Sequence, residues 1–256
     1  MYIEQTDSTN SLMQRLLRGE EPQYAACLEE RVPLLYTTYQ TAGRGQTGNG
    51  WESERGQNLL LSYLLREPQI KATEQFELNI LAAVLTHLAV KDWLTDEQKP
   101  LLTIKWPNDI YYGDRKIAGI LVENSLSGAD VLHSIAGIGI NVNQDHFPEE
   151  LSEIATSIRL ETGQRLQRAD LLVRILESFE KYYGIYEKNG ELSELKDRYN
   201  SLLVSRGKEV EVMDEKPYTG VSEGINAKGE LLVRTKEGIK NVAYGEVSVR
   251  GIYGYV

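Results

Sequence analysis

The stretch from Leu101 to Val142 constrains the fold of this 256-residue chain more than any other part of the sequence. It holds four β-rich runs, LLTIKW, IYY, KIAGILVEN and VLHSIAGIGINV, and the turn sequences Pro107-Asn108-Asp109 and Gly113-Asp114 separate the first three. Short runs rich in Val, Ile and Tyr that are joined by Gly, Pro, Asn and Asp are typical of neighbouring strands. The pattern therefore predicts a meander within one mixed sheet.

Helical patterns flank this block on both sides. Apolar residues recur at helical spacing from about Glu74 to Leu94, and again over residues 169–187 and 192–204. A shorter helix is expected after Ser8, ending before Gly19, and the runs LLYTTYQ and LLLSYLL before the long helix resemble strands. Helices that cover one face of such a sheet make an α+β domain.

The texture of the sequence changes at about Ser205. Short strand-like runs then recur every eight to ten residues, KEVEVMD, YTGVSEG, GELLVRT and KNVAYGEVSVRG, with glycines at the turns. We therefore predict two domains: residues 1–204 form the α+β domain and residues 205–256 form a small β-barrel.

Composition restricts the partners. A formal net charge of -10 argues against a general affinity for nucleic acid or for an anionic membrane, so an anionic ligand must meet a local basic cluster. The apolar stretches are too short to cross a bilayer. With one cysteine, Cys27, and a start, MYIEQTDSTN, that lacks the features of a signal peptide, we expect a cytoplasmic protein.

A glycine-rich loop, QTAGRGQTGNGW, precedes the second strand-like run, and Gly43, Gly45 and Gly48 match the G-x-G-x-x-G pattern of dinucleotide-binding turns. In such a turn the third glycine opens a helix, whereas here polar residues and a strand follow. The glycines with Arg44 instead describe a cationic loop that is able to fold over a phosphate. The alternative is a long, solvated hairpin loop.

Several segments in this order resemble the bacterial biotin protein ligases. They are Asp7-Ser8-Thr9-Asn10, Gln40, GRGQTGNGW, KWPND, RKIAGILVE and GIGIN, and they extend over most of the chain. The resemblance implies a class II synthetase-like catalytic domain with a central mixed sheet, followed by an SH3-like barrel. Because no helix-turn-helix precedes Ser8, we expect a short form without a DNA-binding domain, and therefore not a repressor.

The resemblance also implies a two-step reaction. The biotin carboxylate attacks the α-phosphorus of ATP to give biotinyl-5′-AMP and pyrophosphate, and a lysine of a biotin carboxyl carrier protein then takes the biotinyl group. Mg²⁺ is expected to bridge phosphate oxygens with Asp109 as a neighbour, and no ligand is assigned. The glycine loop would close over the intermediate and exclude water.

Site residues follow from the matched positions. The candidates for the reacting centre are Lys116 and Arg44, because cations must offset the charge that gathers on the phosphate. Those for biotin are Ser8, Thr9, Gln40, Gly43, Arg44, Lys116 and Gly137. Those for the nucleotide are Gln46, Trp51, Asn108 and Asn141.

Each assignment has a plainer alternative. Lys116 taken alone is a solvated turn lysine, Ser8 and Thr9 are helix caps, and Trp51 is an ordinary core residue. For the whole protein, the alternatives are a lipoate or octanoyl transferase-like ligase and a non-catalytic biotin-binding sensor. A homodimer is compatible with the sequence, and the three histidines lie outside every motif.

One position departs from the resemblance. The family usually has a second arginine in the loop, as G-R-G-R, where this chain has Gln46. Losing one cation from the loop predicts weaker retention of biotinyl-AMP.

Overall fold

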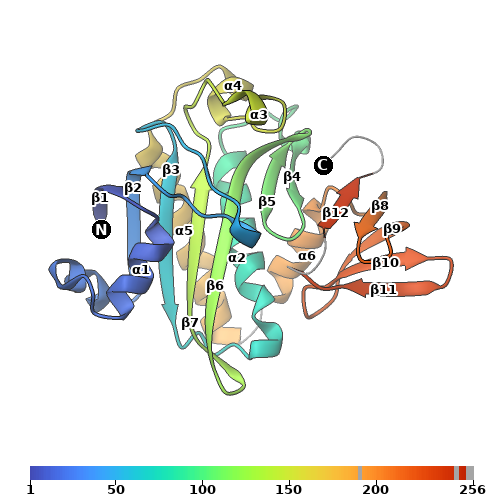
Figure 1. The fold of residues 1–256 in the computed structure, drawn as a ribbon, viewed down its shortest axis with the longest axis horizontal. Helices are drawn as coiled ribbons and strands as arrows, with labels where there is room; N and C mark the ends of the chain where they lie inside the picture. Colours follow the sequence, from blue (N-terminus) through green and yellow to red (C-terminus); the bar gives the residue numbers. More distant parts are fainter. Residues whose placement is uncertain (190–191, 245–247, 252–256) are drawn as a thin grey trace.

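The larger part of the protein is built on one seven-stranded sheet (Figure 1). A computed structural model describes residues 1–189, 192–244 and 248–251. The strand order is β1-β2-β3-β7-β6-β5-β4. The bounds are Tyr2–Thr6 for β1, Leu34–Gln40 for β2, Leu59–Arg66 for β3, Leu102–Lys105 for β4, Asp109–Tyr112 for β5, Arg115–Ser127 for β6 and Asp130–Ile140 for β7.

The predicted meander is present in this sheet. Strands β4, β5, β6 and β7 follow one another and pair antiparallel, as do β2 with β3 and β3 with β7. Strand β1, which the sequence analysis did not predict, pairs parallel with β2 and makes the sheet mixed. Gly139 of β7 lies opposite both Leu60 of β3 and Gly119 of β6.

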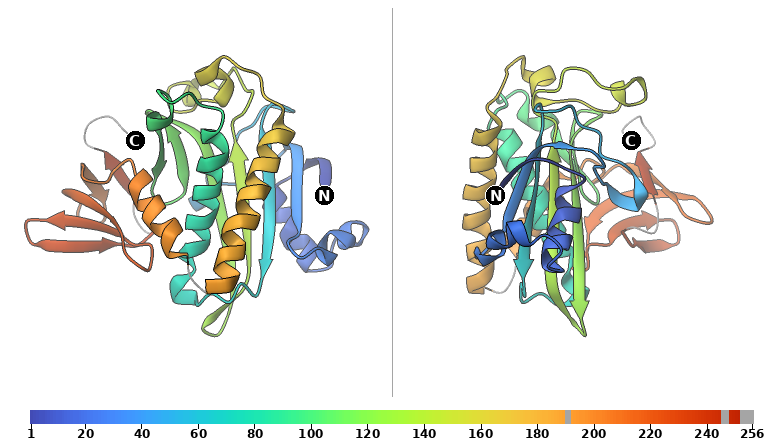
Figure 2. Two further views of the ribbon diagram at one scale, coloured as in Figure 1. Left: turned by 180° about the vertical axis from the view of Figure 1, so that it is seen from behind. Right: turned by 60° about the vertical axis from the view of Figure 1, so that its left-hand side comes forward.

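Three helices cover one face of the sheet, as Figure 2 shows from behind. They are α2 (Phe76–Lys91), α5 (Arg168–Asn189) and α6 (Ser193–Leu202), close to the predicted ranges. Helix α2 is apolar on all sides, and four successive residues, Ala82 to Leu85, are 0% exposed. A helix of this kind needs cover on every side, which α5 and α6 provide together with the sheet.

The opposite face carries helix α1 (Thr9–Leu17), so the sheet lies between two helical layers (Figure 2). Leu12, Met13 and Leu16 of α1 pack with Leu64 and Ile135 of the sheet. Short elements connect the main ones: η1 (Pro22–Glu29), η2 (Gln46–Gly48), η3 (Ala72–Glu74), η4 (Lys99–Leu101), α3 (Glu149–Ser152) and α4 (Ile158–Thr162). Among the described residues, no helix is both long and apolar enough to span a membrane.

The C-terminal part forms a separate five-stranded antiparallel sheet, ordered β11-β10-β9-β8-β12. Its strands are β8 (Glu209–Met213), β9 (Tyr218–Ile225), β10 (Leu231–Thr235), β11 (Gly238–Val242) and β12 (Ser248–Gly251). The fourth run predicted from the sequence divides into β11 and β12, at opposite edges of this sheet. The architecture confirms the predicted fold class, whereas the domain boundary at 204/205 stays a prediction.

The two sheets are joined by direct contacts next to the Pro107 turn. Trp106 donates its indole N–H to the carbonyl oxygen of Gly229, 2.9 Å away, in the turn between β9 and β10. The hydroxyl of Tyr199 on α6 donates to the Pro107 carbonyl at 2.7 Å. Core residues of the C-terminal sheet, among them Val210 and Leu231, belong to the same hydrophobic cluster as α2. The second sheet therefore supports the turn that carries Asn108.

The burial of His87 on α2 predicts that the protein is less stable at acidic pH. His87 is 2% exposed, and its Nε2 lies 3.1 Å from the carbonyl oxygen of Leu102. Burial lowers its pKa from 6.5 to about 4. Because the unfolded chain then binds the proton more readily, the free energy of unfolding is expected to fall as the pH drops from 6.5 to 4, and to level off below 4.

Urea denaturation at several pH values checks this, with His87→Gln as the comparison. Glutamine keeps a donor for the Leu102 carbonyl but does not titrate in this range. We expect the wild type to lose on the order of 2–3 kcal/mol more than the variant across the window. Identical pH profiles would contradict the prediction.

Candidate active site

A cavity of about 460 Å³ opens on the α1 side of the large sheet, over strands β6 and β7. It lies where the end of β2, the start of β5 and the start of α1 meet the segment that runs from Arg44 to Trp51. The predicted site residues in its wall are Ser8, Thr9, Gln40, Arg44, Gln46, Trp51, Asn108, Asp109, Lys116 and Gly137. Gly43 and Asn141 do not line it.

The indole of Trp51 forms the floor of the cavity and lies against two glycines of the sheet. Gly119 of β6 and Gly139 of β7 are cross-strand partners. A Cβ at these positions would lie 2.7 Å and 2.5 Å from ring atoms of Trp51. The sheet therefore needs glycine at both places for the indole to lie flat against it. Trp51 is thus a wall residue of the cavity rather than an ordinary core residue.

A polar end of the cavity is built around the start of α1. Gln40, the last residue of β2, accepts through its Oε1 from the backbone N–H of Thr9 at 2.8 Å and from the Thr9 hydroxyl at 3.1 Å. Ser62 of β3 lies 2.7 Å from the same hydroxyl. Ser8 stands at the N-cap position of α1, but its side chain makes no capping hydrogen bond. The capping alternative for Ser8 therefore finds no support.

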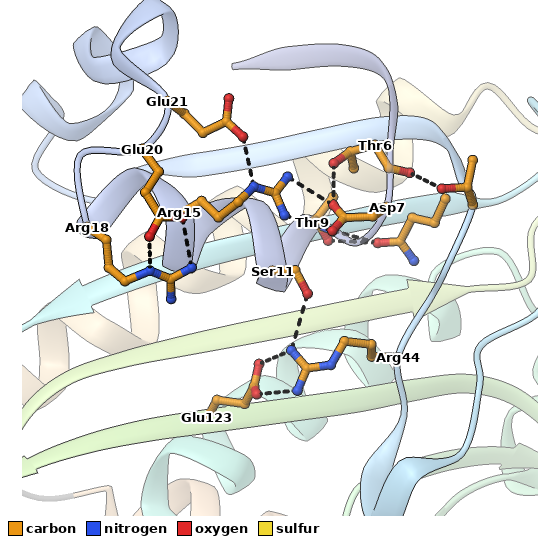
Figure 3. A network of polar contacts seen from close by, with 12 residues as sticks. Thr6, Asp7, Thr9, Ser11, Arg15, Arg18, Glu20, Glu21, Arg44 and Glu123 are labelled. Carbon is orange, nitrogen blue, oxygen red and sulfur yellow. Dashed lines mark hydrogen bonds and ion pairs between the residues drawn. The ribbon is translucent and has the colours of Figure 1, made fainter.

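The segment that carries these polar groups is anchored by an ion-pair network (Figure 3). Arg15 binds the carboxylate of Asp7 at 2.7 Å and that of Glu21 at 2.8 Å. Burial alone would raise the pKa of Asp7, but hydrogen bonds from Arg15, the Ser8 N–H and Thr6 lower it to about 2. Asp7 therefore stays ionised and fixes the entry to α1.

The glycine loop forms a compact hairpin and leads into strand β3. The backbone N–H of Trp51 donates to the Gly43 carbonyl at 3.0 Å, and that of Gly45 to the Asn49 carbonyl at 2.7 Å. Gly43 supports this turn, since a Cβ there would lie 2.3 Å from the carbonyl oxygen of Trp51. Gly48 ends the short η2 with φ +80° and opens no helix. The structure agrees with the exclusion of a dinucleotide-binding turn.

Lys116 projects into the cavity from the start of β6. Its Nζ lies 2.8 Å from Oδ1 of Asp109 on β5 and 5.5 Å from the ring centre of Trp51. The backbone of Lys116 is pinned on both sides, because its N–H donates to Ile154 and its carbonyl accepts from Thr156. This is a lysine fixed by a rigid element, with 31% of its side chain exposed. The solvated-turn alternative does not describe it.

Arg44 reaches from the glycine loop towards β6 (Figure 3). Its Nη2 lies 2.7 Å from Oε1 of Glu123, and its Nη1 lies 3.3 Å from the hydroxyl of Ser11 on α1. Both cations predicted for the reacting centre, Arg44 and Lys116, therefore stand in one cavity, each beside a carboxylate.

The two predicted asparagines differ in position. Asn108 lines the cavity, and it is tied to Ile120 of β6 by its side-chain amide and by its own carbonyl. Asn141 lies behind the wall, where its Nδ2 donates to the Thr156 carbonyl at 3.0 Å. Its Oδ1 is buried and has no hydrogen-bond partner. At this position Asn141 does not reach the cavity.

Besides Gly119 and Gly139, further residues that were not singled out from the sequence lie in or next to the cavity wall. Lys105 lines it, and burial lowers the pKa of its amine. Asn10, 2% exposed, joins Ser62 to Glu123. Val249 of β12 brings the C-terminal sheet to the wall. Lys105, Asn10 and Glu123 lie inside or at the ends of the quoted motifs, but nothing in the sequence indicates Val249.

Comparisons with known proteins agree with this geometry. Residues 3–141 match the model of the Biotin/lipoate A/B protein ligase family. The chain belongs to this family. Residues 207–250 match the Biotin protein ligase C terminal domain. The second match places the chain among the biotin protein ligases, as the sequence motifs predicted.

Individual relatives are consistent with that placement. The chain is 36% identical over 219 residues to the bifunctional ligase/repressor BirA of Bacillus spizizenii, covering 84% of this chain and 66% of that protein. It is 27% identical to the biotin–[acetyl-CoA-carboxylase] ligase of Paracoccus denitrificans, covering 97% and 100%. The biotin protein ligase of Aquifex aeolicus, solved with biotin and ATP, superposes with a TM-score of 0.75 and 29% identity over 98% of both chains.

Proposed function

We propose that this biotin protein ligase adenylates biotin with ATP and transfers the biotinyl group to a lysine of a biotin carboxyl carrier protein. The observation that carries the proposal is one cavity that is lined by Lys116 and Arg44, by the polar residues Ser8, Thr9 and Gln40, and by the indole of Trp51. Two anions must meet at such a centre, and cations placed where charge accumulates lower the barrier.

The polar end suits the ureido group of biotin. Ser8, Thr9 and Gln40 offer donors and acceptors there, on elements that are fixed by hydrogen bonds. Gly137 of β7 lines the same cavity, and its lack of a side chain makes room for the amide of Asn10. The biotin carboxylate would then point along the cavity towards Lys116 and Arg44, where it meets the α-phosphorus.

The indole floor suits the nucleotide. Trp51 offers an aromatic face, Asn108 lines the wall, and the unpaired Oδ1 of Asn141 would accept from an adenine amino group. That Oδ1 requires a small opening of the wall, since Asn141 does not line the cavity. Gln46 completes this end from the loop.

The proposal includes Mg²⁺, and the donor set fits it. Mg²⁺ bound with a nucleotide usually takes one or two carboxylates together with phosphate oxygens and water. Asp109 supplies one carboxylate beside Lys116, while the described residues hold no cluster of three metal ligands. When bound, the ion would neutralise phosphate charge, and Asp109 would hold it next to the reacting centre.

In the second step the acceptor lysine attacks the carbonyl of biotinyl-AMP and releases AMP. The glycine loop, which lines the cavity between Arg44 and Trp51, would exclude water from the intermediate. We propose a carrier protein as partner, no nucleic acid or membrane partner, and a cytoplasmic location, where ATP is available. A homodimer is compatible with the proposal.

The departure at Gln46 gives a prediction about the intermediate. Gln46 lines the cavity at the start of η2. Replacing it with arginine adds a charged donor near the phosphate, so release of labelled biotinyl-AMP is expected to slow by about tenfold. The comparison variant is Gln46→Met, which has similar length and no charge. Unchanged release in Gln46→Arg would contradict the prediction.

The test of the function is biotin-dependent exchange of labelled pyrophosphate into ATP in the presence of Mg²⁺, with lipoate in a parallel reaction. Exchange with biotin alone supports the ligase. Exchange with lipoate alone would support a lipoate or octanoyl transferase-like ligase instead. Binding of biotin without any exchange would support the sensor alternative instead.

A further inference from the structure

Glu123 of β6 is a partly buried partner of the loop arginine. It meets Arg44 end-on, with Nη2 to Oε1 at 2.7 Å and Nη1 to Oε2 at 3.4 Å. Its side chain is 23% exposed, whereas that of Arg44 is 42% exposed. The Glu123 carboxylate is therefore the fixed partner on the sheet, and the Arg44 guanidinium is the partner that the glycine loop carries.

The position of Glu123 is set by a second residue, Asn10 of α1. Nδ2 of Asn10 donates to Oε2 of Glu123 at 2.8 Å and to the Leu121 carbonyl at 3.2 Å. Oδ1 of Asn10 accepts from the Ser62 hydroxyl at 2.6 Å. Both polar atoms of the Asn10 amide thus make hydrogen bonds. The Glu123 carboxylate is therefore held by a buried side chain that is itself fixed.

Gly137 makes this support possible. A Cβ at Gly137 would lie 2.3 Å from Oδ1 of Asn10, so a larger residue would displace the amide. The absence of a side chain at Gly137 therefore serves Asn10 as well as the cavity.

The guanidinium of Arg44 keeps N–H donors that can bind a substrate. An arginine has five N–H donors, and the contacts with Glu123 and Ser11 engage only its Nη1 and Nη2 ends. The loop that carries Arg44 is rich in glycine and thus has a large conformational freedom to lose. A carboxylate that already fixes the guanidinium reduces the ordering required when substrates bind.

We propose that Glu123, supported by Asn10, is a positioning residue that holds Arg44 over the reacting centre during adenylation. This inference rests on the function proposed above. It assigns Glu123 no contact with substrate. Its effect passes through Arg44 and appears in the rate of the chemical step rather than in the affinity for biotin.

A double-mutant cycle tests the inference by pyrophosphate exchange. Glu123→Gln retains an acceptor for Asn10 but loses the charge that holds Arg44. We expect kcat to fall about tenfold with KM for biotin within about twofold of wild type. In an Arg44→Ala background the same change should alter kcat by less than about twofold, because the residue it positions is absent. Glu30→Gln, an exposed carboxylate, controls for the loss of one charge.

Three results would overturn the inference. Wild-type kcat in Glu123→Gln would do so, as would an equal loss of kcat in the wild-type and Arg44→Ala backgrounds, which a merely structural role predicts. Absence of biotin-dependent exchange in the wild type would overturn it together with the proposed function, whereas the first two results leave that function intact. If thermal unfolding shows that Glu123→Gln does not fold, Glu123→Asp replaces it in the double-mutant cycle with Arg44→Ala. Aspartate keeps the negative charge, but its shorter side chain moves the carboxylate away from Arg44.

Discussion

Replacing Lys116 with alanine is expected to reduce biotin-dependent pyrophosphate exchange by between about 100- and 1,000-fold. The amine stands in the cavity 2.8 Å from Asp109, on a strand whose backbone is pinned to residues 154–156. Its removal takes away a cation that offsets charge in the transition state. It also breaks the ion pair with Asp109, the carboxylate proposed to hold Mg²⁺.

Two variants make this measurement specific. Lys71→Ala breaks another lysine–aspartate pair, with Asp130, at a residue that does not line the cavity, and it should leave exchange unchanged. Lys116→Arg keeps the charge but spreads it over a larger planar group, so it should recover only part of kcat. Exchange in Lys116→Ala that stays within about threefold of wild type would exclude Lys116 from the reacting centre.

Much of the fold was predictable because its signals are local. Most of the sixteen residues of helix α2 are apolar, and strands β4 to β7 are separated by short turns that contain Pro, Gly, Asn and Asp. Strand β1 was missed because YIEQT carries no regular alternation, and it becomes a strand only by pairing with β2. The division of the last run into β11 and β12 depends likewise on which partners each half finds.

The site was predictable where a motif places a residue in the wall, as for Lys116 and Trp51. It was not predictable where position depends on contacts between distant segments. Glu123 belongs to the site because Arg44, 79 residues earlier, reaches it. Asn141 lies in a matched motif and yet behind the wall, because its amide group serves Thr156. Sequence spacing does not contain this information.

The contact between the two sheets leads to the second large prediction, at Gly229. This residue has φ +78°, and a Cβ there would lie 2.0 Å from Cγ of Phe76, the first residue of α2. Phe76 is 1% exposed and has no room to move aside. Gly229→Ala combines a left-handed backbone with overpacking, so we expect the free energy of unfolding to fall by about 4 kcal/mol in urea denaturation.

The comparison variant separates the two causes. Gly207 has a similar φ of +74°, but a Cβ there would meet no atom within 4 Å. Gly207→Ala is therefore expected to cost only about 1–2 kcal/mol, and equal losses in both variants would show that the contact with Phe76 is unimportant. Because the Gly229 carbonyl holds the indole of Trp106, its displacement also loosens the turn that carries Asn108 and Asp109. The folded fraction of Gly229→Ala should thus show a raised KM for ATP. Gly207→Ala should not change this KM. Such a difference would identify the C-terminal sheet as a support of the nucleotide end of the site.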